Sequence, residues 1–486
     1  MKKSIIIIGS GFSSLSASCY LAQAGYDVTI LEKNDTIGGR ARQLKKDGFT
    51  FDIGPTWYWM PDVFERFFSD FDKSPSNYYT LEKLNPAYSV YFGKDDYITI
   101  EDTLEKILIA FEKEEKGSSK KLKTFIEKAK SNYDIAIKDL VYNPGVSLLE
   151  LITLETAKKV NQFFSNIKRD VRKEFKNDRL VKILEFPVLF LGAKPSDTPS
   201  FYSFMNYADF GLGTFHPKKG MYQVILAMES LAKELGVTIK TNAPVEKILT
   251  KNRQAIGVVS RGISHLADVV LSGADYHHTE TLLEKPLRQY SESYWSKKTF
   301  APSSLLFYVG FDKELKNVNH HTLFFDVDFD VHAEAIYDNP KWPENPLFYA
   351  SFPSKTDDNC APKGNEAGIF LIPLAPGIED TPELRNLYFD KIIKRFEDLT
   401  SQNITKHIIF KESFCLNDFI KDYNSYKGNA YGMANTLTQT AFLRPKLKSK
   451  KVKSLYFTGQ LTVPGPGVPP SLISGKLVSE LIIKHN

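Results

Sequence analysis

Hydrophobic residues at the start of the chain are grouped in a way that predicts a strand, a helix and a second strand. Residues 5–8 are four consecutive isoleucines, which is typical of a parallel strand buried on both faces. Apolar residues follow at helical spacing between positions 15 and 22, a glycine stands at 25, and a second apolar run covers 28–31. We therefore predict a β-α-β unit of about 30 residues.

The turn of this unit carries glycines in the arrangement that favours a dinucleotide. It reads GSGFSS at residues 9–14, and the second strand ends at Glu32. Gly9 permits a tight turn, Gly11 lets the backbone approach a pyrophosphate, and the helix N-terminus attracts the anion. Glu32 would hold the ribose hydroxyls. Ser14 replaces the third glycine of the pattern and is small enough for close packing of the helix.

The last 33 residues predict a second strand, loop and helix. Residues 454–459 read as a short strand that ends at Gly459, a loop rich in glycine and proline follows, and apolar residues recur at helical spacing from about Ser471 to Ile483. Pro469 and Pro470 stand where the first turn of a helix tolerates proline. A helix N-terminus that follows such a loop is a second candidate anion site.

Composition and charge exclude several classes of protein. The 486 residues have room for two or three domains. A net charge of +5 is too weak for nucleic-acid binding, so no nucleic-acid partner is expected. Three widely spaced cysteines support no disulfide framework, and a reducing, cytoplasmic location follows. No apolar run reaches the roughly 18 residues of a membrane span.

Metal chemistry and other common catalytic motifs are not expected. The histidine pairs 277–278 and 320–321 are adjacent in sequence, so their side chains diverge, and the chain has no HExxH motif and no cysteine-histidine cluster. It also has no P-loop lysine and no GxSxG elbow, so phosphoryl transfer and triad hydrolysis lack support. No metal is predicted.

Two further motifs carry a resemblance to a known superfamily. The segments IGGRA at 37–41 and FDIGPT at 51–56 resemble the flavin-containing amine oxidase and carotenoid desaturase superfamily. The resemblance implies that the GGR segment lies along the pyrophosphate of FAD, with Arg40 contributing charge. It also implies that Gly54, Pro55 and Thr56 lie near the flavin ring.

The C-terminal part resembles one branch of this superfamily, the bacterial-type phytoene desaturases. Residues 428–445 and 455–476 match its C-terminal signature, and residues 216–248 match a middle segment. The matching positions of the signature are Gly428, Ala430, Tyr431, Gly432, Gln439, Phe442, Arg444 and Pro445. In the middle segment, Lys219 and Gly220 stand where the family carries two glycines, and the resemblance implies that the backbone of Val245 meets the adenine end.

The predicted fold class is α/β, with a Rossmann-type, glutathione-reductase-like FAD-binding domain interrupted by a mixed α+β substrate domain. We expect the FAD-binding domain to comprise residues 1–75, 216–285 and 421–486, and the substrate domain to comprise 76–215 and 286–420. The predicted cofactor-binding residues are Gly9, Gly11, Phe12, Ser13, Ser14, Glu32, Lys33, Gly39, Arg40, Gly54, Pro55, Thr56, Val245, Gly459, Gly467 and Val468. No catalytic residue is assigned.

Several segments of the substrate domain bear on how it would meet its substrate. Residues 101–139 read as charged and helical, with a solvated turn at 113–123. The apolar segment 183–192 is either buried core or a lid that dips into a lipid membrane surface. Residues 57–59, a Trp-Tyr-Trp run, are expected to border the flavin. The five lysines within 446–453 are expected to lie in solvent, where they could touch lipid head groups.

The resemblance implies an FAD-dependent oxidoreductase that desaturates phytoene towards lycopene in carotenoid biosynthesis by hydride transfer to the flavin. Its partners would be a hydrophobic carotenoid substrate, a membrane surface for peripheral association, and oxygen or a quinone as electron acceptor. The alternatives are a desaturase of a hydroxylated carotenoid, a carotenoid isomerase, an amine oxidase, and a non-catalytic, GDI-like prenyl-binding escort protein.

Overall fold

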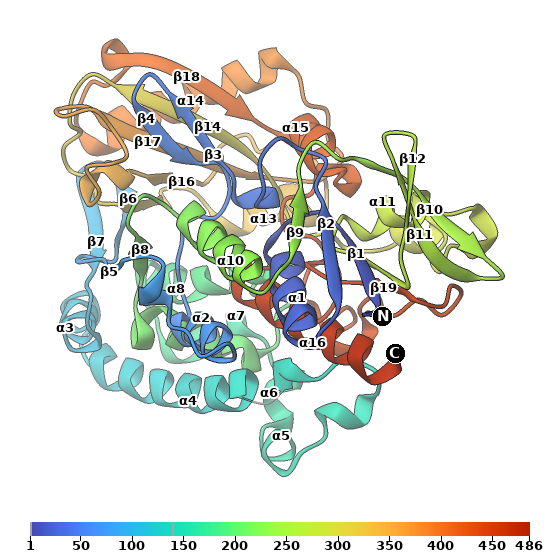
Figure 1. Cartoon of the computed structure of the whole chain (residues 1–486). Coiled ribbons are helices and arrows are strands. Elements are labelled where there is room, and N and C mark those ends of the chain that lie inside the picture. The colour runs from blue at the N-terminus through green and yellow to red at the C-terminus, as the bar shows by residue number, and fades with distance from the viewer. Residues whose placement is uncertain (1, 139) are drawn as a thin grey trace.

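A parallel sheet of five strands forms the centre of the molecule (Figure 1). The computed structural model describes residues 2–138 and 140–486. The strands run in the order β19-β13-β1-β2-β9, and every neighbouring pair is parallel. Their bounds are β1 (Ser4–Ile8), β2 (Asp27–Leu31), β9 (Thr238–Lys240), β13 (Val269–Ser272) and β19 (Leu455–Phe457). Strands from three distant parts of the chain therefore meet in one sheet.

Both faces of this sheet are covered, which explains the run of isoleucines in β1. Ile5 and Ile7 pack with the helices on one face, and Ile6 and Ile8 pack with a small antiparallel sheet on the other. The helices are α1 (Phe12–Gln23), α10 (Tyr222–Glu234) and α16 (Val468–His485). The small sheet consists of β10 (Val245–Lys251), β11 (Gln254–Ser260) and β12 (Ile263–Leu266). The predicted first strand, helix and second strand are confirmed.

A second sheet of seven strands forms the other large layer, in the order β18-β14-β17-β16-β15-β6-β7. The pair β15 and β6 is parallel and the other pairs are antiparallel. The strands are β6 (Tyr88–Gly93), β7 (Asp96–Ile100), β14 (Ser303–Phe311), β15 (His321–Phe324), β16 (Phe348–Ser351), β17 (Glu366–Leu374) and β18 (Ile408–Phe414). Helix α14 (Pro382–Thr400) packs its apolar face against them.

Helices between residues 104 and 212 build a third layer, at the bottom of Figure 1. The segment predicted to be helical over 101–139, with a turn at 113–123, forms two helices, α3 (Leu104–Glu114) and α4 (Ser118–Lys138). They separate at Gly117, which has a φ of +81°, and Asp139 lies outside the described residues. The shorter helices of the layer are α5 (Leu154–Lys158), α6 (Val160–Phe164), α7 (Ile167–Glu174), α8 (Asp178–Glu185) and α9 (Phe204–Tyr207).

The remaining elements connect these layers. Two separate antiparallel pairs are the hairpin of β3 (Gln43–Lys46) with β4 (Phe49–Asp52), and the long-range pair of β5 (Leu81–Lys83) with β8 (Phe215–Pro217). The remaining helices are α2 (Pro61–Ser69), α11 (Tyr276–Thr281), α12 (Glu292–Ser296), α13 (Phe329–Tyr337) and α15 (Leu416–Tyr423).

The predicted fold class, α/β with a mixed α+β insertion, is confirmed. The strands of the parallel sheet fall within 1–75, 216–285 and 421–486, and those of the seven-stranded sheet fall within 76–215 and 286–420. The exact domain boundaries stay a prediction, and β4 packs its phenylalanines against the seven-stranded sheet. Within residues 2–138 and 140–486, no helix combines the length and the apolar composition needed to cross a bilayer.

Candidate functional site

The glycine turn lies between β1 and the N-terminus of α1. Gly9 has a φ of +86°, a conformation that side chains other than glycine rarely adopt. Helix α1 begins at Phe12, and Gly11 precedes it without any side-chain cap. The first N–H groups of α1, at Phe12, Ser13 and Ser14, therefore lack an intrahelical acceptor, and this favours an anion at the turn.

Ser14 replaces the expected glycine without disturbing the turn, because a glycine faces it. The side chain of Ser14 is fully buried, and a Cβ atom at Gly273 would lie 2.0 Å from its Oγ. Gly273 directly follows β13, so the small residue needed where α1 meets the sheet has moved to the neighbouring strand. The departure at Ser14 is therefore compatible with a tight helix-sheet contact.

Glu32 closes β2 and is tied to the glycine turn. The N–H and the hydroxyl of Ser10 donate to its Oε2 at 2.8 and 2.7 Å, and the N–H of Asn34 donates to Oε1 at 2.9 Å. The N–H of Ala243 donates to the backbone oxygen of Glu32 at 2.7 Å. The start of β10 at Val245 therefore lies close to the acidic residue, as a shared adenosine site requires.

Lys33 points its ammonium group to helix α15 rather than to the glycine turn at residues 9–14. Its Nζ donates to the backbone oxygen of Lys421 in α15, and burial lowers the pKa of Lys33. Its predicted role in holding the cofactor therefore gains no support from this geometry.

Arg40 is a half-buried cation that forms no ion pair within the described part of the chain, although the charge of the buried Asp275 acts on it. It lies in a short turn with Gly39, which packs close to the glycine turn: a Cβ atom added at Gly39 would lie 3.3 Å from the Cα of Gly11. Its Nη2 donates to Ser425 Oγ at 3.2 Å and to the backbone oxygen of Asn429 at 3.4 Å, while its buried Nε has no partner in the described part of the chain. Burial lowers the pKa of Arg40. A pyrophosphate would supply the missing negative charge and acceptor.

The segment after β4 and the loop before α16 meet on the wall of one cavity. Gly54, Pro55 and Thr56 line it from one side, and Gly467 and Val468 line it from another. Helix α16 begins at Val468 and not near Ser471, because both prolines fit its first turn. Gly459 and Gly467 both have a positive φ, of +104° and +115°.

This cavity has a volume of about 860 Å³ and a mostly apolar wall. It extends from the Gly54–Thr56 segment to the helical layer, where Ile152, Val160 and Phe164 border it. Ile152 and Phe164 are also strongly exposed, so this end of the cavity opens at the protein surface. The wall contains no lysine, arginine or aspartate among the described residues. Such a space suits a long apolar molecule better than a charged one.

The aromatic residues after Thr56 divide between the cavity and the core. Trp57 and Trp59 line the cavity, and their position beside the flavin stays a prediction. Tyr58 does not line it, because its ring is buried on the other side, stacked on Phe64 at 4.2 Å. Side chains alternate along an extended segment, which explains why the middle residue turns away.

The apolar segment 183–192 is core and not a surface lid. Most of it is buried, and it forms the end of α8 followed by a 3₁₀ turn, Phe186–Leu191. Phe190 packs against Trp59 with ring centroids 4.8 Å apart. The lid alternative is therefore wrong for this segment, because its apolar side chains are used to build the cavity wall.

The five lysines of 446–453 are only partly exposed to solvent, whereas all five were expected to lie in solvent. Lys450, Lys451 and Lys453 are exposed, whereas Lys446 and Lys448 are half-buried. The Nζ of Lys446 donates to the backbone oxygens of Gly145 and Phe442. This lysine therefore holds the chain beside the cavity instead of lying free in solvent.

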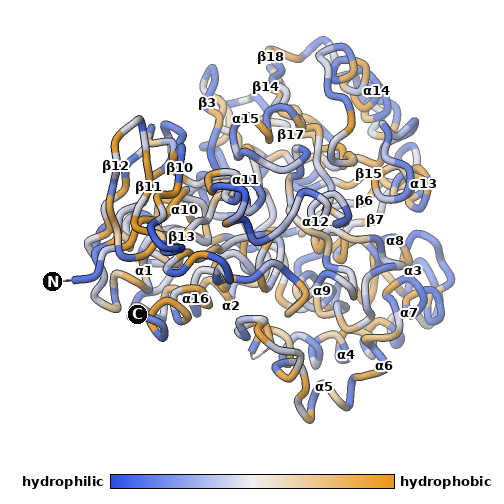
Figure 2. Tube along the Cα trace, turned by 90° about the vertical axis from the view of Figure 1, so that its right-hand side faces the viewer, coloured by the Kyte–Doolittle hydropathy of each residue, from blue (hydrophilic) through white to orange (hydrophobic). Residues whose placement is uncertain are grey.

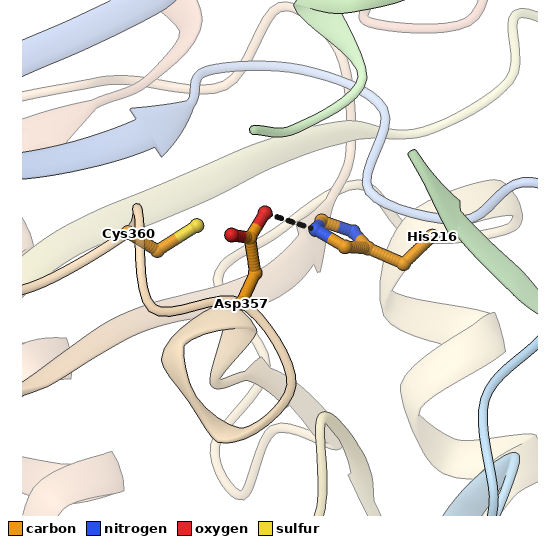
Figure 3. Close-up of side chains that lie close together, drawn as sticks. All are labelled: His216, Asp357 and Cys360. Atoms are coloured by element: carbon orange, nitrogen blue, oxygen red, sulfur yellow. Dashed lines mark hydrogen bonds and ion pairs between the residues drawn. The ribbon is translucent and has the colours of Figure 1, made fainter. Parts of the chain in front are cut away.

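A buried cluster of His216, Asp357 and Cys360 has the composition of a metal site but is satisfied without one (Figure 3). His216 Nε2 lies 3.1 Å from Asp357 Oδ2. Burial acts against the charged form of Asp357, but hydrogen bonds from His216, Asn359 and the N–H of Lys219 outweigh it and lower the pKa of Asp357. Burial raises the pKa of Cys360, which keeps its thiol protonated. The cluster therefore ties β8 to residues 353–360.

This contact also explains the departure at Lys219. Lys219 has a φ of +71°, the left-handed conformation for which the family uses glycine, and its N–H is held by Asp357.

Two residues of the cavity wall, His332 and Tyr349, and a third residue behind it, His321, are missing from the residues predicted to form the site. Tyr349 and His332 line the cavity, and His321 Nδ1 lies 2.6 Å from Tyr349 Oη. They come from β15, β16 and α13, which have no recognisable motif. The one available signal was the pair His320 and His321, which we considered only as metal ligands.

Comparison with known proteins agrees with this geometry. The model of the family "Flavin containing amine oxidoreductase" matches residues 12–483. A carotenoid 3,4-desaturase from Haloarcula japonica is 40% identical over 484 residues, which covers 99% of this chain and 98% of the relative. A 4,4'-diapophytoene desaturase from Staphylococcus aureus is 31% identical over 502 residues, which covers 99% of this chain and 98% of the relative.

Among solved structures, an oxidoreductase from Methanosarcina mazei matches with a TM-score of 0.63. It is 16% identical, the match covers 98% of this chain and 100% of that protein, and it shows the fold alone. The glycine turn and the unpartnered Nε of Arg40 fit the pyrophosphate of a dinucleotide, as FAD requires. The chain therefore belongs to the carotenoid desaturase family of the flavin-containing amine oxidoreductases, with FAD as its cofactor.

Proposed function

We propose that this protein is an FAD-dependent carotenoid desaturase that converts phytoene towards lycopene. The observation that carries the proposal is the apolar cavity, which joins the predicted flavin-ring segment Gly54–Thr56 to an opening at the surface. A carotenoid is a long apolar chain, and a cavity of this composition would hold it by burial of apolar surface.

The chemistry divides between the cofactor and the chain. FAD supplies the acceptor for a hydride from an allylic C–H bond of the substrate. The chain binds the polyene, orients the reacting carbons and excludes water. Trp57 and Trp59 offer flat apolar surfaces beside the Gly54–Thr56 segment, and Phe186 and Phe190 close the wall behind them.

A second candidate function is a carotenoid desaturase that acts at a different position of its substrate. The relative that is 40% identical is named a carotenoid 3,4-desaturase, which favours reaction near the end of a carotenoid that is already conjugated. The relative that is 31% identical, a 4,4'-diapophytoene desaturase, favours an uncoloured substrate of the phytoene kind. The C-terminal signature between residues 428 and 445 supports the phytoene assignment.

Purified protein loaded with FAD and incubated with phytoene in liposomes tests the assignment. Chromatography and visible spectra should show coloured, lycopene-like products without NAD(P)H as reductant, with oxygen or a quinone taking the electrons. Unchanged phytoene, together with conversion of lycopene or a hydroxylated carotenoid, would favour the second candidate. A carotenoid isomerase would change geometry without loss of hydrogen. Purification without bound flavin would favour an escort protein.

We also propose that the protein associates peripherally with a membrane through the mouth of the cavity. The segment around α5 and α6 projects from the body at the bottom of Figures 1 and 2. Its apolar side chains are exposed, among them Leu154 at 82% and Phe164 at 79%. Exposed apolar surface of this kind is costly in water and is typical of a docking site. A lipid-soluble substrate would then enter without crossing water.

Liposome sedimentation tests this surface. The double variant Leu154→Asp, Phe164→Asp should release the protein from phospholipid vesicles and leave bound flavin unchanged. Leu266→Asp is the matched control, because Leu266 on β12 is 73% exposed and lies far from the cavity in sequence and sheet. Equal release by both variants would mean that no particular surface is used.

A further inference from the structure

Desaturation leaves a proton to be removed, and the cavity wall holds few groups that could accept it. After a hydride has left one carbon, a proton must leave the neighbouring carbon to form the double bond. Among the described residues, the titratable side chains of the wall are Glu150, Tyr202, His332, Tyr337, Tyr349 and Tyr431.

Glu150 and His332 are already occupied. Glu150 accepts the N–H groups of Gly145, Val146 and Ser147 at the outer end of the cavity. His332 Nδ1 accepts the N–H of Leu347 at 2.9 Å, and its Nε2 lies 2.9 Å from the backbone oxygen of Pro373. Both ring nitrogens of His332 are therefore used in the neutral form, and burial lowers the pKa of His332 to about 4.

Tyr349 differs from the other three tyrosines of the cavity wall: of these four, it is the one whose hydroxyl is hydrogen-bonded to a titratable side chain within the described part of the chain. His321 Nδ1 lies 2.6 Å from its hydroxyl oxygen, and Thr56 Oγ1 lies 2.9 Å from the same atom. By contrast, the hydroxyl of Tyr202 lies 2.7 Å from that of Thr440. Thr56 belongs to the predicted flavin-ring segment, so Tyr349 lies where reaction is expected.

His321 has the free capacity that His332 lacks. It is fully buried, its Nε2 has no hydrogen-bond partner among the residues that the structure describes, and its ring stacks on Trp57 at 4.0 Å. Burial lowers the pKa of His321 well below its usual value, so the ring is neutral at rest. A neutral imidazole is nevertheless a far stronger base than a polyene, which is what the carbocation becomes when it loses its proton, so transfer of that proton towards the imidazole is favourable.

A row of imidazoles continues from His321 to a carboxylate. The ring of His320 lies 4.5 Å from that of His321, and the ring of His216 lies 4.6 Å from that of His320. His216 is hydrogen-bonded to Asp357, and Lys218 is the cation that faces this group. A positive charge formed on His321 would therefore lie two rings from a carboxylate that is ionised.

Given the desaturation proposed above, we propose that Tyr349 is the catalytic residue that removes the proton and that His321 is the positioning residue that receives it in turn. The C–H bond breaks, and its electron pair becomes the new double bond. The oxygen of Tyr349 takes the carbon-bound proton while its own proton passes to Nδ1 of His321. Two electrons leave with the hydride to FAD and pass to the oxygen or quinone acceptor, and the imidazolium later releases its proton to solvent.

The variants Tyr349→Phe and His321→Asn test the two roles. Both should slow single-turnover desaturation by about 10²- to 10⁴-fold, the usual contribution of general-base catalysis. Asn retains a polar atom near the position of Nδ1 but cannot take up the proton, so a merely structural hydrogen bond would survive in it. Tyr91→Phe is the control, since Tyr91 is buried in β6 of the same sheet and bonds a backbone oxygen.

A second measurement does not depend on turnover. With ¹⁵N-labelled histidine, the apoprotein has nine imidazoles to assign, and the nitrogen shifts of His321 should report an Nδ1 that accepts from Tyr349. Tyr349→Phe should change these nitrogen shifts without changing the affinity for FAD. Tyr91→Phe should leave the nitrogen shifts of His321 unchanged.

The outcomes separate the two proposals. Equal single-turnover rates for wild type, Tyr349→Phe and His321→Asn, with FAD bound in each, would overturn the proton-acceptor role and leave the proposed function intact. A wild-type protein that binds FAD and desaturates no carotenoid would overturn both. Slow turnover by both variants and unchanged turnover by Tyr91→Phe would support the role.

Discussion

Replacing Arg40 by methionine should separate binding of FAD from stability of the protein. Arg40 is half-buried, its two hydrogen bonds to neutral oxygens measure 3.2 and 3.4 Å, and its Nε has no partner within residues 2–138 and 140–486. A cation in this position adds little to the stability of the apoprotein, because its loss of hydration outweighs the attraction of Asp275 and the pKa of Arg40 is lowered. We expect the free energy of unfolding of the apoprotein to stay the same or to rise by about 1 kcal/mol.

The affinity for FAD should change in the opposite direction. A hydrogen bond to a charged group contributes about 1.5–3 kcal/mol, so Arg40→Met should weaken FAD binding about 10- to 100-fold. Titration of apoprotein with FAD, followed by flavin fluorescence, measures the affinity, and urea unfolding of the same apoprotein measures the stability.

Arg42 provides a matched control two residues away. Its guanidinium group contacts Asp422 and Tyr423, so it already has an acidic partner. Arg42→Met should lower the free energy of unfolding by about 1.5–3 kcal/mol and leave FAD affinity within a factor of a few. If Arg40→Met instead destabilises the apoprotein as much as Arg42→Met does and leaves FAD affinity unchanged, then Arg40 serves the fold and not the phosphates.

Three further changes test the core around the cavity. Asp209 accepts a hydrogen bond from Tyr88, and burial raises the pKa of its carboxyl to about 8. The same carboxyl ionises near pH 4 in the unfolded chain, so the free energy of unfolding should fall by about 1.4 kcal/mol per pH unit between pH 4 and 8. Asp209→Asn should lack this slope in urea unfolding, and equal slopes would refute the assignment. Gly54→Ala should lower the thermal midpoint, because a Cβ would lie 1.9 Å from the oxygen of Arg40. Phe190→Asp should destabilise the protein without releasing it from liposomes, since its ring packs on the cavity tryptophans.

The nucleotide-binding half of the molecule was predictable from the sequence because its signals are local. A run of isoleucines, the glycine turn and Glu32 are close together in the chain, and the fold of such a unit follows from strand burial and backbone freedom. The start of α16 was placed three residues late because proline at the first helical turn is compatible with either position. The turn predicted at 113–123 within the helical segment 101–139 is found around Gly117, but it is shorter than predicted, because α4 already begins at Ser118.

The cavity and its chemistry were decided by tertiary contacts. The sequence shows that 183–192 is apolar, but apolar residues suit a membrane lid and a buried wall equally well, and only packing against Trp57 and Trp59 distinguishes them. Likewise, His321 and Tyr349 are 28 residues apart and carry no motif. Their hydrogen bond exists because β15 and β16 pair antiparallel in one register, and such long-range pairing depends on the whole fold.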